Sequence, residues 1–151
     1  MKTVLDHTTF WENETDCLLR LLNEWRPSAS GLSEREYEAE LDAWLTAKLP
    51  DVPIVRQYGI AKGDADLVIH DSWVIELKLA FTADRLGEFD RCVGQLERYR
   101  QKWVDKERGK IFLVIVGKSE SEFRNMLHKA IKGMNQHYIS DDFFHIVEKH
   151  G

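Results

Sequence analysis

Two short segments separated by a turn constrain the fold of this chain most strongly. They run from Gly63 to Ile69 and from Trp73 to Ala80, and both are rich in β-branched and aliphatic residues. Their apolar residues alternate with a period of two, which predicts adjacent strands rather than one helix. The polar faces of the two strands would carry Asp64 and Asp66 on the first, and Glu76 and Lys78 on the second.

The length of the turn decides whether these polar faces coincide. A two-residue loop at Asp71 and Ser72 would pair Val68 with Ile75 and separate Asp66 from the polar face of the second strand. Asp-Ser is a poor sequence for such a hairpin, because two-residue turns prefer Asn-Gly, Asp-Gly or a leading Gly. The shorter loop is therefore disfavoured.

A three-residue loop at 70–72 gives a different register. It pairs Ile69 with Trp73 and sets Asp66 opposite Glu76, with directly opposed Cβ atoms about 5 Å apart. We expect this register, or an equivalent bulge. It brings two carboxylates and the neighbouring lysine into one small polar patch.

Composition bounds the class of protein. The 151 residues, 43% hydrophobic and 31% charged, predict a single globular domain. No apolar run approaches the roughly 18 residues of a membrane span and no signal-peptide pattern is visible, so we expect a cytoplasmic protein without a membrane partner. The net charge of −5 argues against a surface that binds nucleic acid throughout, but it allows a local basic groove. Cys17 and Cys92 are expected to be free thiols in the core.

The remaining segments alternate between helical and strand patterns. Capping-box spacing at Thr9 and Glu12, and again at Ser33 and Glu36, predicts two helix starts. The full expected order is a helix from about 9 to 25, a helix from 33 to 49, strands at 54–58, 63–69 and 73–80, a helix at 82–104, a doubly buried strand at 110–117, a helix at 119–135 and a strand at 143–147. In the last helix the predicted inward residues are Phe123, Met126, Leu127, Ala130 and Ile131, and the histidines, among them His145, are expected at the surface or in turns.

The helix at 82–104 has a polar edge beside its core face. The predicted core residues are Leu86, Phe89, Cys92, Val93, Leu96 and Trp103. Gln95 and Tyr99, four residues apart, lie at the edge of this arc. Arg91, Arg98 and Lys102 lie just beyond them. These three are either a basic shoulder for nucleic acid or an ordinary solvated face, since acidic residues lie elsewhere on the same helix.

The order of elements predicts an α/β sandwich with a mixed sheet. A helix Glu followed by an Asp and a Glu-x-Lys on successive strands resembles the restriction-endonuclease-like fold of the PD-(D/E)XK nuclease superfamily. The resemblance covers about Ser33 to Gly117 and implies an α-β-β-β-α-β catalytic core at 33–117. Residues 1–32 would then be an accessory N-terminal helix and 118–151 a C-terminal helix and strand of the same single domain.

The resemblance also implies roles for individual residues. Asp66 and Glu76 would be ligands of Mg²⁺, for which Mn²⁺ can substitute, and Lys78 would position or activate the attacking water. Glu38, which follows an aromatic residue, is similar to the aromatic-Glu motif of Mrr-like enzymes. Glu40 and Asp64 remain alternatives to Glu38 and Asp66, and Ala65 stands where the family motif has Pro.

The predicted chemistry fits these residue types. Mg²⁺ prefers hard oxygen ligands and typically takes one or two protein carboxylates, which leaves the Leu77 carbonyl as a third protein oxygen. Without metal, at least one of the two close carboxyls should have a raised pKa, and Lys78 should stay charged. Gln95 and Tyr99, which are similar to the Gln-x-x-x-Tyr motif of RecB-like exonucleases, would hydrogen-bond the scissile phosphate or a strand end. The cations Arg91, Arg98 and Lys102 would bind the phosphate backbone.

These features predict a Mg²⁺-dependent nuclease that hydrolyses DNA in repair, recombination or defence, with RNA left open as a substrate. One alternative is a catalytically silent nucleic-acid-binding or assembly subunit that uses the same fold. A structural-interaction domain with no nucleic-acid role is another. The resemblance makes a homodimer or a subunit of a larger complex plausible. It leaves open the strandedness of the substrate, endo- or exonuclease action and sequence preference.

Overall fold

A five-stranded mixed sheet organises the part of the chain that the computed structural model describes, which comprises residues 14–60, 63–70, 72–103, 110–135 and 144–149. The elements are α2 (Glu14–Glu24), α3 (Glu34–Lys48), β1 (Ile54–Ile60), β2 (Gly63–Ile69), β3 (Trp73–Leu79), the short 3₁₀ helix η1 (Ala83–Arg85), α4 (Leu86–Trp103), β4 (Lys110–Val116), α5 (Ser121–Asn135) and β5 (Phe144–Lys149). The expected α/β class with a mixed sheet is confirmed.

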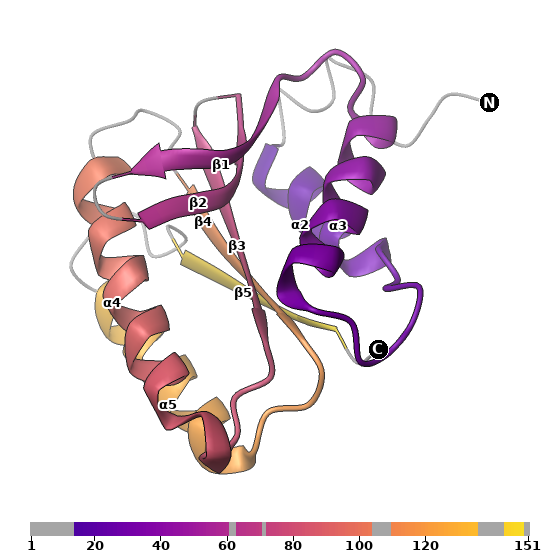
Figure 1. The fold of residues 1–151 in the computed structure, drawn as a ribbon. Coiled ribbons are helices and arrows are strands. Elements are labelled where there is room, and N and C mark those ends of the chain that lie inside the picture. Colours follow the sequence, from indigo (N-terminus) through magenta and orange to yellow (C-terminus); the bar gives the residue numbers. More distant parts are fainter. Residues whose placement is uncertain (1–13, 61–62, 71, 104–109, 136–143, 150–151) are drawn as a thin grey trace.

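The strands lie in the order β1-β2-β3-β4-β5. The pairs β1–β2 and β2–β3 are antiparallel, whereas β3–β4 and β4–β5 are parallel. Helices α4 and α5 cover one face of the sheet and α2 and α3 lie on the other (Figure 1). None of the described helices is both long and apolar enough to cross a bilayer.

The turn between β2 and β3 has the predicted three-residue length. Ile69 pairs with Trp73, and the register continues inward to Leu67 and Ile75. His70 adopts a left-handed φ of 50° at the first turn position, a conformation uncommon for a residue with a Cβ. Its backbone N–H donates to the carbonyl of Pro53 at 2.7 Å, which fixes the turn against the start of β1.

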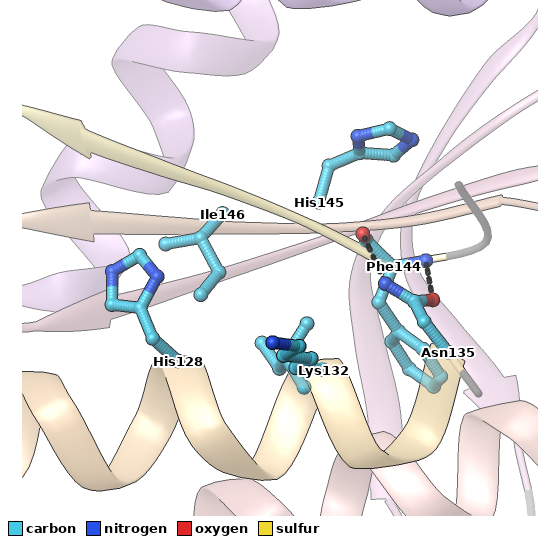
Figure 2. A pocket seen from close by; sticks show the side chains of 7 residues that line it. His128, Lys132, Asn135, Phe144, His145 and Ile146 are labelled. Carbon is cyan, nitrogen blue, oxygen red and sulfur yellow. Dashed lines mark hydrogen bonds between the residues drawn. The ribbon is translucent and has the colours of Figure 1, made fainter. Parts of the chain in front are cut away.

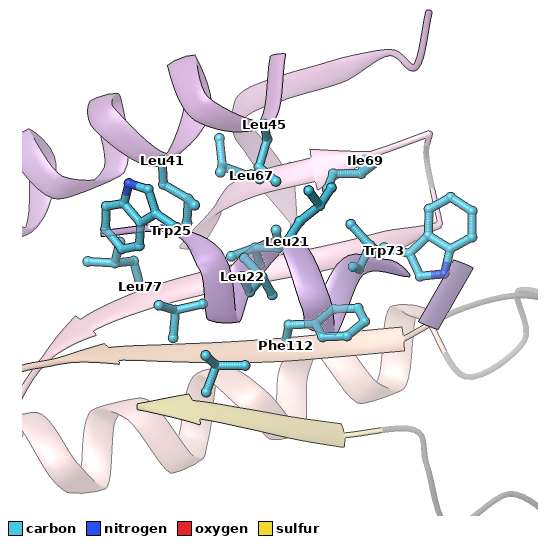
Figure 3. Close-up of a cluster of buried hydrophobic side chains, with 14 of the residues drawn as sticks. Leu21, Leu22, Trp25, Leu41, Leu45, Leu67, Ile69, Trp73, Leu77 and Phe112 are labelled. Carbon is cyan, nitrogen blue, oxygen red and sulfur yellow. The ribbon is translucent and has the colours of Figure 1, made fainter. Parts of the chain in front are cut away.

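The sheet divides the apolar residues into two buried clusters. Alternate residues of the central strands pack with α2 and α3 on one side and with α4 and α5 on the other. Figure 3 shows the first cluster, in which the side chains of Leu21 and Leu22 from α2 and Leu41 and Leu45 from α3 gather over the sheet. Residues 111–116 of β4 are buried throughout, as the unbroken apolar run predicted.

Local signals at the helices are largely confirmed. Ser33 and Glu36 form both bonds of a capping box at the start of α3. Cys17 and Cys92 are free and buried. The predicted cap at Thr9 and Glu12 lies outside the described residues.

Two predicted side-chain placements away from the candidate site are wrong. Met126 is 45% exposed, because the sheet covers only the narrow stripe of α5 formed by Phe123, Leu127, Ile131 and Met134. His145 is half-buried rather than at the surface or in a turn. Parallel pairing of β4 with β5 sets its ring against Phe112, with ring centroids 5.1 Å apart.

Candidate functional site

The candidate site lies where the β2–β3 ladder ends. The described pairing of these strands stops at Leu67 and Ile75. Beyond that point, the Leu77 N–H donates to Asp66 Oδ2 at 2.7 Å and the Leu79 N–H donates to Glu34 Oε2 at 3.0 Å. Side-chain carboxylates therefore accept the N–H groups that strand carbonyls would accept in a continued ladder.

The predicted strand alternation holds Glu76 and Lys78 together on the side of the sheet that faces α4. Glu76 is 2% exposed and Lys78 is 7% exposed. Lys78 Nζ lies 3.4 Å from Glu76 Oε2, and the Tyr99 hydroxyl of α4 donates to Glu76 Oε1 at 2.8 Å. The Glu76 carboxylate is thus held by a cation and a hydroxyl in a nearly water-free setting.

Burial makes the two central carboxyls hard to ionise. It raises the pKa of Asp66 to about 9, with further upward effects from Glu76 and Glu38 and an opposing one from the Leu77 N–H. Burial also raises the pKa of Glu76, against the opposing effects of Lys78 and Tyr99. The predicted pair of strongly interacting carboxyls is therefore present. Ionisation of both carboxyls together is unfavourable, because each is buried and the two negative charges repel each other.

The same surroundings keep Lys78 in its charged form. Burial acts to lower its pKa, but the negative charges of Glu76 and Glu34 outweigh this effect and the pKa is raised. Lys78 therefore stays charged, as predicted. Cys92 is also close enough to be affected, and burial raises the pKa of its thiol to about 12, so it remains neutral beside the ion pair.

Two glutamates of α3 approach this site, and sequence reasoning named only one. Glu38 is 4% exposed, accepts a hydrogen bond from Arg56 Nε at 3.0 Å and raises the pKa of Asp66. The missed residue is Glu34, which binds the Leu79 N–H. Its four-residue spacing from Glu38 on one helix face was the available signal. The alternative Glu40 bonds the backbone and hydroxyl of Ser28 instead.

The other predicted site residues differ in burial and in their contacts with the site. Tyr99 is only 1% exposed, so it lies inside the core rather than at its edge, and burial followed by the charge of Glu76 raises its pKa. Gln95 is half-buried, and its Oε1 has no hydrogen-bond partner among the described residues. Arg91 is exposed and pairs with Glu88 on its own helix, whereas Arg98 is half-buried near Tyr99. The side chains of Lys102 and Asp64 lie outside the described residues.

The donor atoms at the site fit magnesium by number and type. Among the described residues no group of three or more His, Cys, Asp or Glu side chains is arranged to hold a metal. A site made by two carboxylates, one backbone carbonyl and waters does not require such a group. The N–H of Leu77 points toward β2, and because both polar groups of a strand residue point to the same side, its carbonyl also points toward β2, on the side of Asp66.

Compared with protein-family models, curated proteins and solved structures, the chain gives no significant match in any of the three comparisons.

Proposed function

We propose that this protein is a Mg²⁺-dependent nuclease that hydrolyses DNA phosphodiester bonds. One observation carries the proposal: the carboxyls of Asp66 and Glu76 are brought together where two strands part, with the charged Lys78 at 3.4 Å from Glu76. The order α3-β1-β2-β3-α4-β4 also supports the finer assignment to a restriction-endonuclease-like fold of the PD-(D/E)XK type.

Each residue has a role that its surroundings support. Asp66, Glu76 and the Leu77 carbonyl would hold Mg²⁺ or Mn²⁺, which lowers the pKa of a bound water and neutralises charge on the phosphate. Lys78 orients the attacking water and offsets the negative charge that develops on the phosphate. Tyr99 fixes the orientation of the Glu76 carboxylate through its 2.8 Å hydrogen bond. Glu38 adds negative charge next to Asp66 and so favours cation binding.

Two cations of α4 support nucleic acid as the substrate class. Arg91 and Arg98 on α4 are the described cations that would contact the phosphate backbone, with Gln95 between them as a hydrogen-bonding group. The overall charge of −5 limits such contacts to a local surface. We propose DNA as the substrate, and RNA is tested beside it. The proposed compartment is the cytoplasm.

The decisive experiment is cleavage of circular and end-labelled single- and double-stranded DNA, a four-way junction and RNA, in Mg²⁺ or Mn²⁺ against chelator. Asp66→Ala and Lys78→Ala should abolish cutting while circular dichroism shows an intact fold. Glu38→Gln should reduce cutting, and Glu40→Gln is its matched control because Glu40 bonds Ser28 away from the site. Unchanged turnover in Lys78→Ala would contradict the assignment of this protein as a nuclease of this type.

A catalytically silent nucleic-acid-binding subunit is the second candidate. It is favoured by the partners that the carboxyls already have: Tyr99 and Lys78 contact Glu76, and the Leu77 N–H contacts Asp66. This candidate predicts retention of nucleic acid that needs no divalent metal and survives Asp66→Ala. Retention without cutting in the assay above would favour it over the nuclease.

A further inference from the structure

The outer edge of β5 lies away from the candidate site, at the end of the sheet. In the strand order that the structure describes, β5 follows β4 and has no strand on its other side. An edge strand presents a row of backbone N–H and C=O groups that can pair with another chain.

The hydrogen bonds identify which groups of β5 point outward. The Lys149 carbonyl accepts from the Gly117 N–H at 2.7 Å, so Lys149 faces β4. Successive residues of a strand direct their backbone groups to alternate sides. The N–H and C=O groups of Phe144, Ile146 and Glu148 therefore face away from β4.

Asn135 already makes the bonds of a neighbouring strand at the first of these positions. Its side-chain amide accepts from the Phe144 N–H at 3.0 Å and donates to the Phe144 carbonyl at 3.3 Å (Figure 2). This is the paired exchange that a peptide group of an added strand would make. Asn135 thus occupies the first position, and Ile146 and Glu148 are the next two in the row.

A groove of about 500 Å³ runs along this edge between α5 and β5. In Figure 2 the side chains of His128 and Asn135 extend from α5 toward the strand, and Lys132 lies between them on α5. Ile131 and Ile146 supply its apolar lining. The groove therefore offers apolar contact and basic groups beside the outward-facing backbone.

The formal charge beside the groove is positive, because Arg124 and Lys132 are two cations and Glu148 is one carboxylate. Arg124, His128 and Lys132 follow one another at four-residue spacing on α5, and Glu148 is the acidic partner of the first two at 3.1 Å. Lys132 is exposed and makes no ion pair with a described carboxylate. A second copy that paired through the same edge would bring the same basic row against itself, so charge complementarity favours an acidic partner.

We infer that the β5 edge binds an extended acidic peptide segment of a partner protein, which adds a sixth strand beside β5. The outward groups of Ile146 and Glu148 supply the backbone hydrogen bonds, and Lys132 supplies the charge preference. This is β-strand addition, in which backbone pairing gives affinity and side-chain contacts give specificity. The inference is independent of the proposed nuclease activity.

The test uses the full chain and a fluorescent peptide in which valine alternates with glutamate. Anisotropy should show binding that weakens with salt, and hydrogen exchange should show new protection of the Ile146 and Glu148 amides. The same peptide N-methylated at every residue should not bind, because neither of its edges can then donate the backbone hydrogen bonds of the added strand. Lys132→Glu should weaken binding about tenfold or more. Lys129→Glu, the matched control at an exposed lysine of α5 that does not line the groove, should have little effect.

Three results would overturn the inference. Binding without protection of Ile146 and Glu148 would place the peptide elsewhere. Protection of these amides that rises with protein concentration alone would make a second copy the occupant. Binding of a single-stranded oligonucleotide with equal loss in Lys132→Glu, and no peptide binding, would assign the basic row to nucleic acid.

Discussion

The Asp66 carboxylate accepts the backbone N–H of Leu77 at 2.7 Å, at the point where the β2–β3 ladder ends. The bond satisfies a strand N–H that would otherwise lose its partner, and it holds the carboxyl beside Glu76. Asp66 therefore has a structural and a chemical role at once. Replacement by Asn separates the two roles, because the amide oxygen can still accept this hydrogen bond while the side chain can no longer ionise.

The stability of the metal-free protein should fall as pH rises. The pKa of Asp66 is about 9 in the folded chain, above its value of about 4 when unfolded. Between these values the folded state binds more protons, so the free energy of unfolding decreases with increasing pH across this window. Asp66→Asn should flatten that slope and be more stable by about 1–4 kcal/mol near pH 8. Denaturant titrations in chelator provide the measurement.

The same titrations contain a control for this prediction. The pKa of Glu76 is raised as well, so a smaller slope of the same sign should persist in Asp66→Asn. Profiles of wild type and variant that run parallel from acid to alkaline pH would contradict the assignment of the slope to Asp66.

Magnesium should stabilise the folded chain through the two carboxyls. At a free metal concentration about a hundred times Kd, the gain in unfolding free energy is about 2.7 kcal/mol. Asp66→Asn and Glu76→Gln should lose this gain, whereas Glu40→Gln should keep it. Thermal unfolding with and without Mg²⁺ measures the effect independently of any cleavage. An equal gain in all four proteins would indicate metal binding elsewhere.

Tyr99→Phe tests the hydroxyl that donates to Glu76. The variant leaves a buried carboxylate oxygen short of a donor and should cost about 1–3 kcal/mol of stability. Because the hydrogen bond acts to lower the pKa of Glu76, its loss should raise that pKa further. Mg²⁺ affinity at neutral pH should then weaken and recover as pH rises. Calorimetric metal titrations at two pH values check this, and a pH-independent loss would contradict it.

Arg56→Ala tests the ion pair at the α3 side of the site. The Glu38 side chain is 5% exposed and that of Arg56 is 36% exposed, so the carboxylate is largely buried while its cation is partly solvated. Removing the cation should destabilise the protein by about 1–3 kcal/mol. Combining it with Glu38→Gln should recover part of the loss. A double-mutant cycle by denaturant unfolding measures this coupling, and strictly additive effects would show that the pair does not interact.

Sequence patterns predicted the features of the site that depend on local geometry. The alternation around Leu77 fixes the faces of β3, and the unfavourable Asp-Ser turn indicates the register that sets Ile69 opposite Trp73. Strand period and turn length are properties of a few consecutive residues. Both can therefore be predicted without knowing how distant segments pack.

Features that depend on packing between distant segments could not be predicted in the same way. Helical periodicity places Tyr99 at the edge of the apolar face of its helix. In the structure it is buried, and its hydroxyl donates a hydrogen bond to the buried Glu76. Met126 is apolar and near the core arc, yet the width of the sheet leaves it exposed. Glu34 carries no motif of its own, and its partner is a backbone group 45 residues away along the chain.

Glu34 gives the last prediction, since it contacts the site through a hydrogen bond and through charge. Its carboxylate accepts the Leu79 N–H at 3.0 Å and contributes to the raised pKa of Lys78. Glu34→Gln retains an acceptor but removes the charge, whereas Glu34→Ala removes both. The Leu79 amide should therefore exchange about tenfold faster in the Ala variant and remain largely protected in the Gln variant. Amide hydrogen exchange followed by NMR gives the measurement. Equally fast exchange in the two variants would show that charge, and not this hydrogen bond, keeps the end of β3 in place where the strands part.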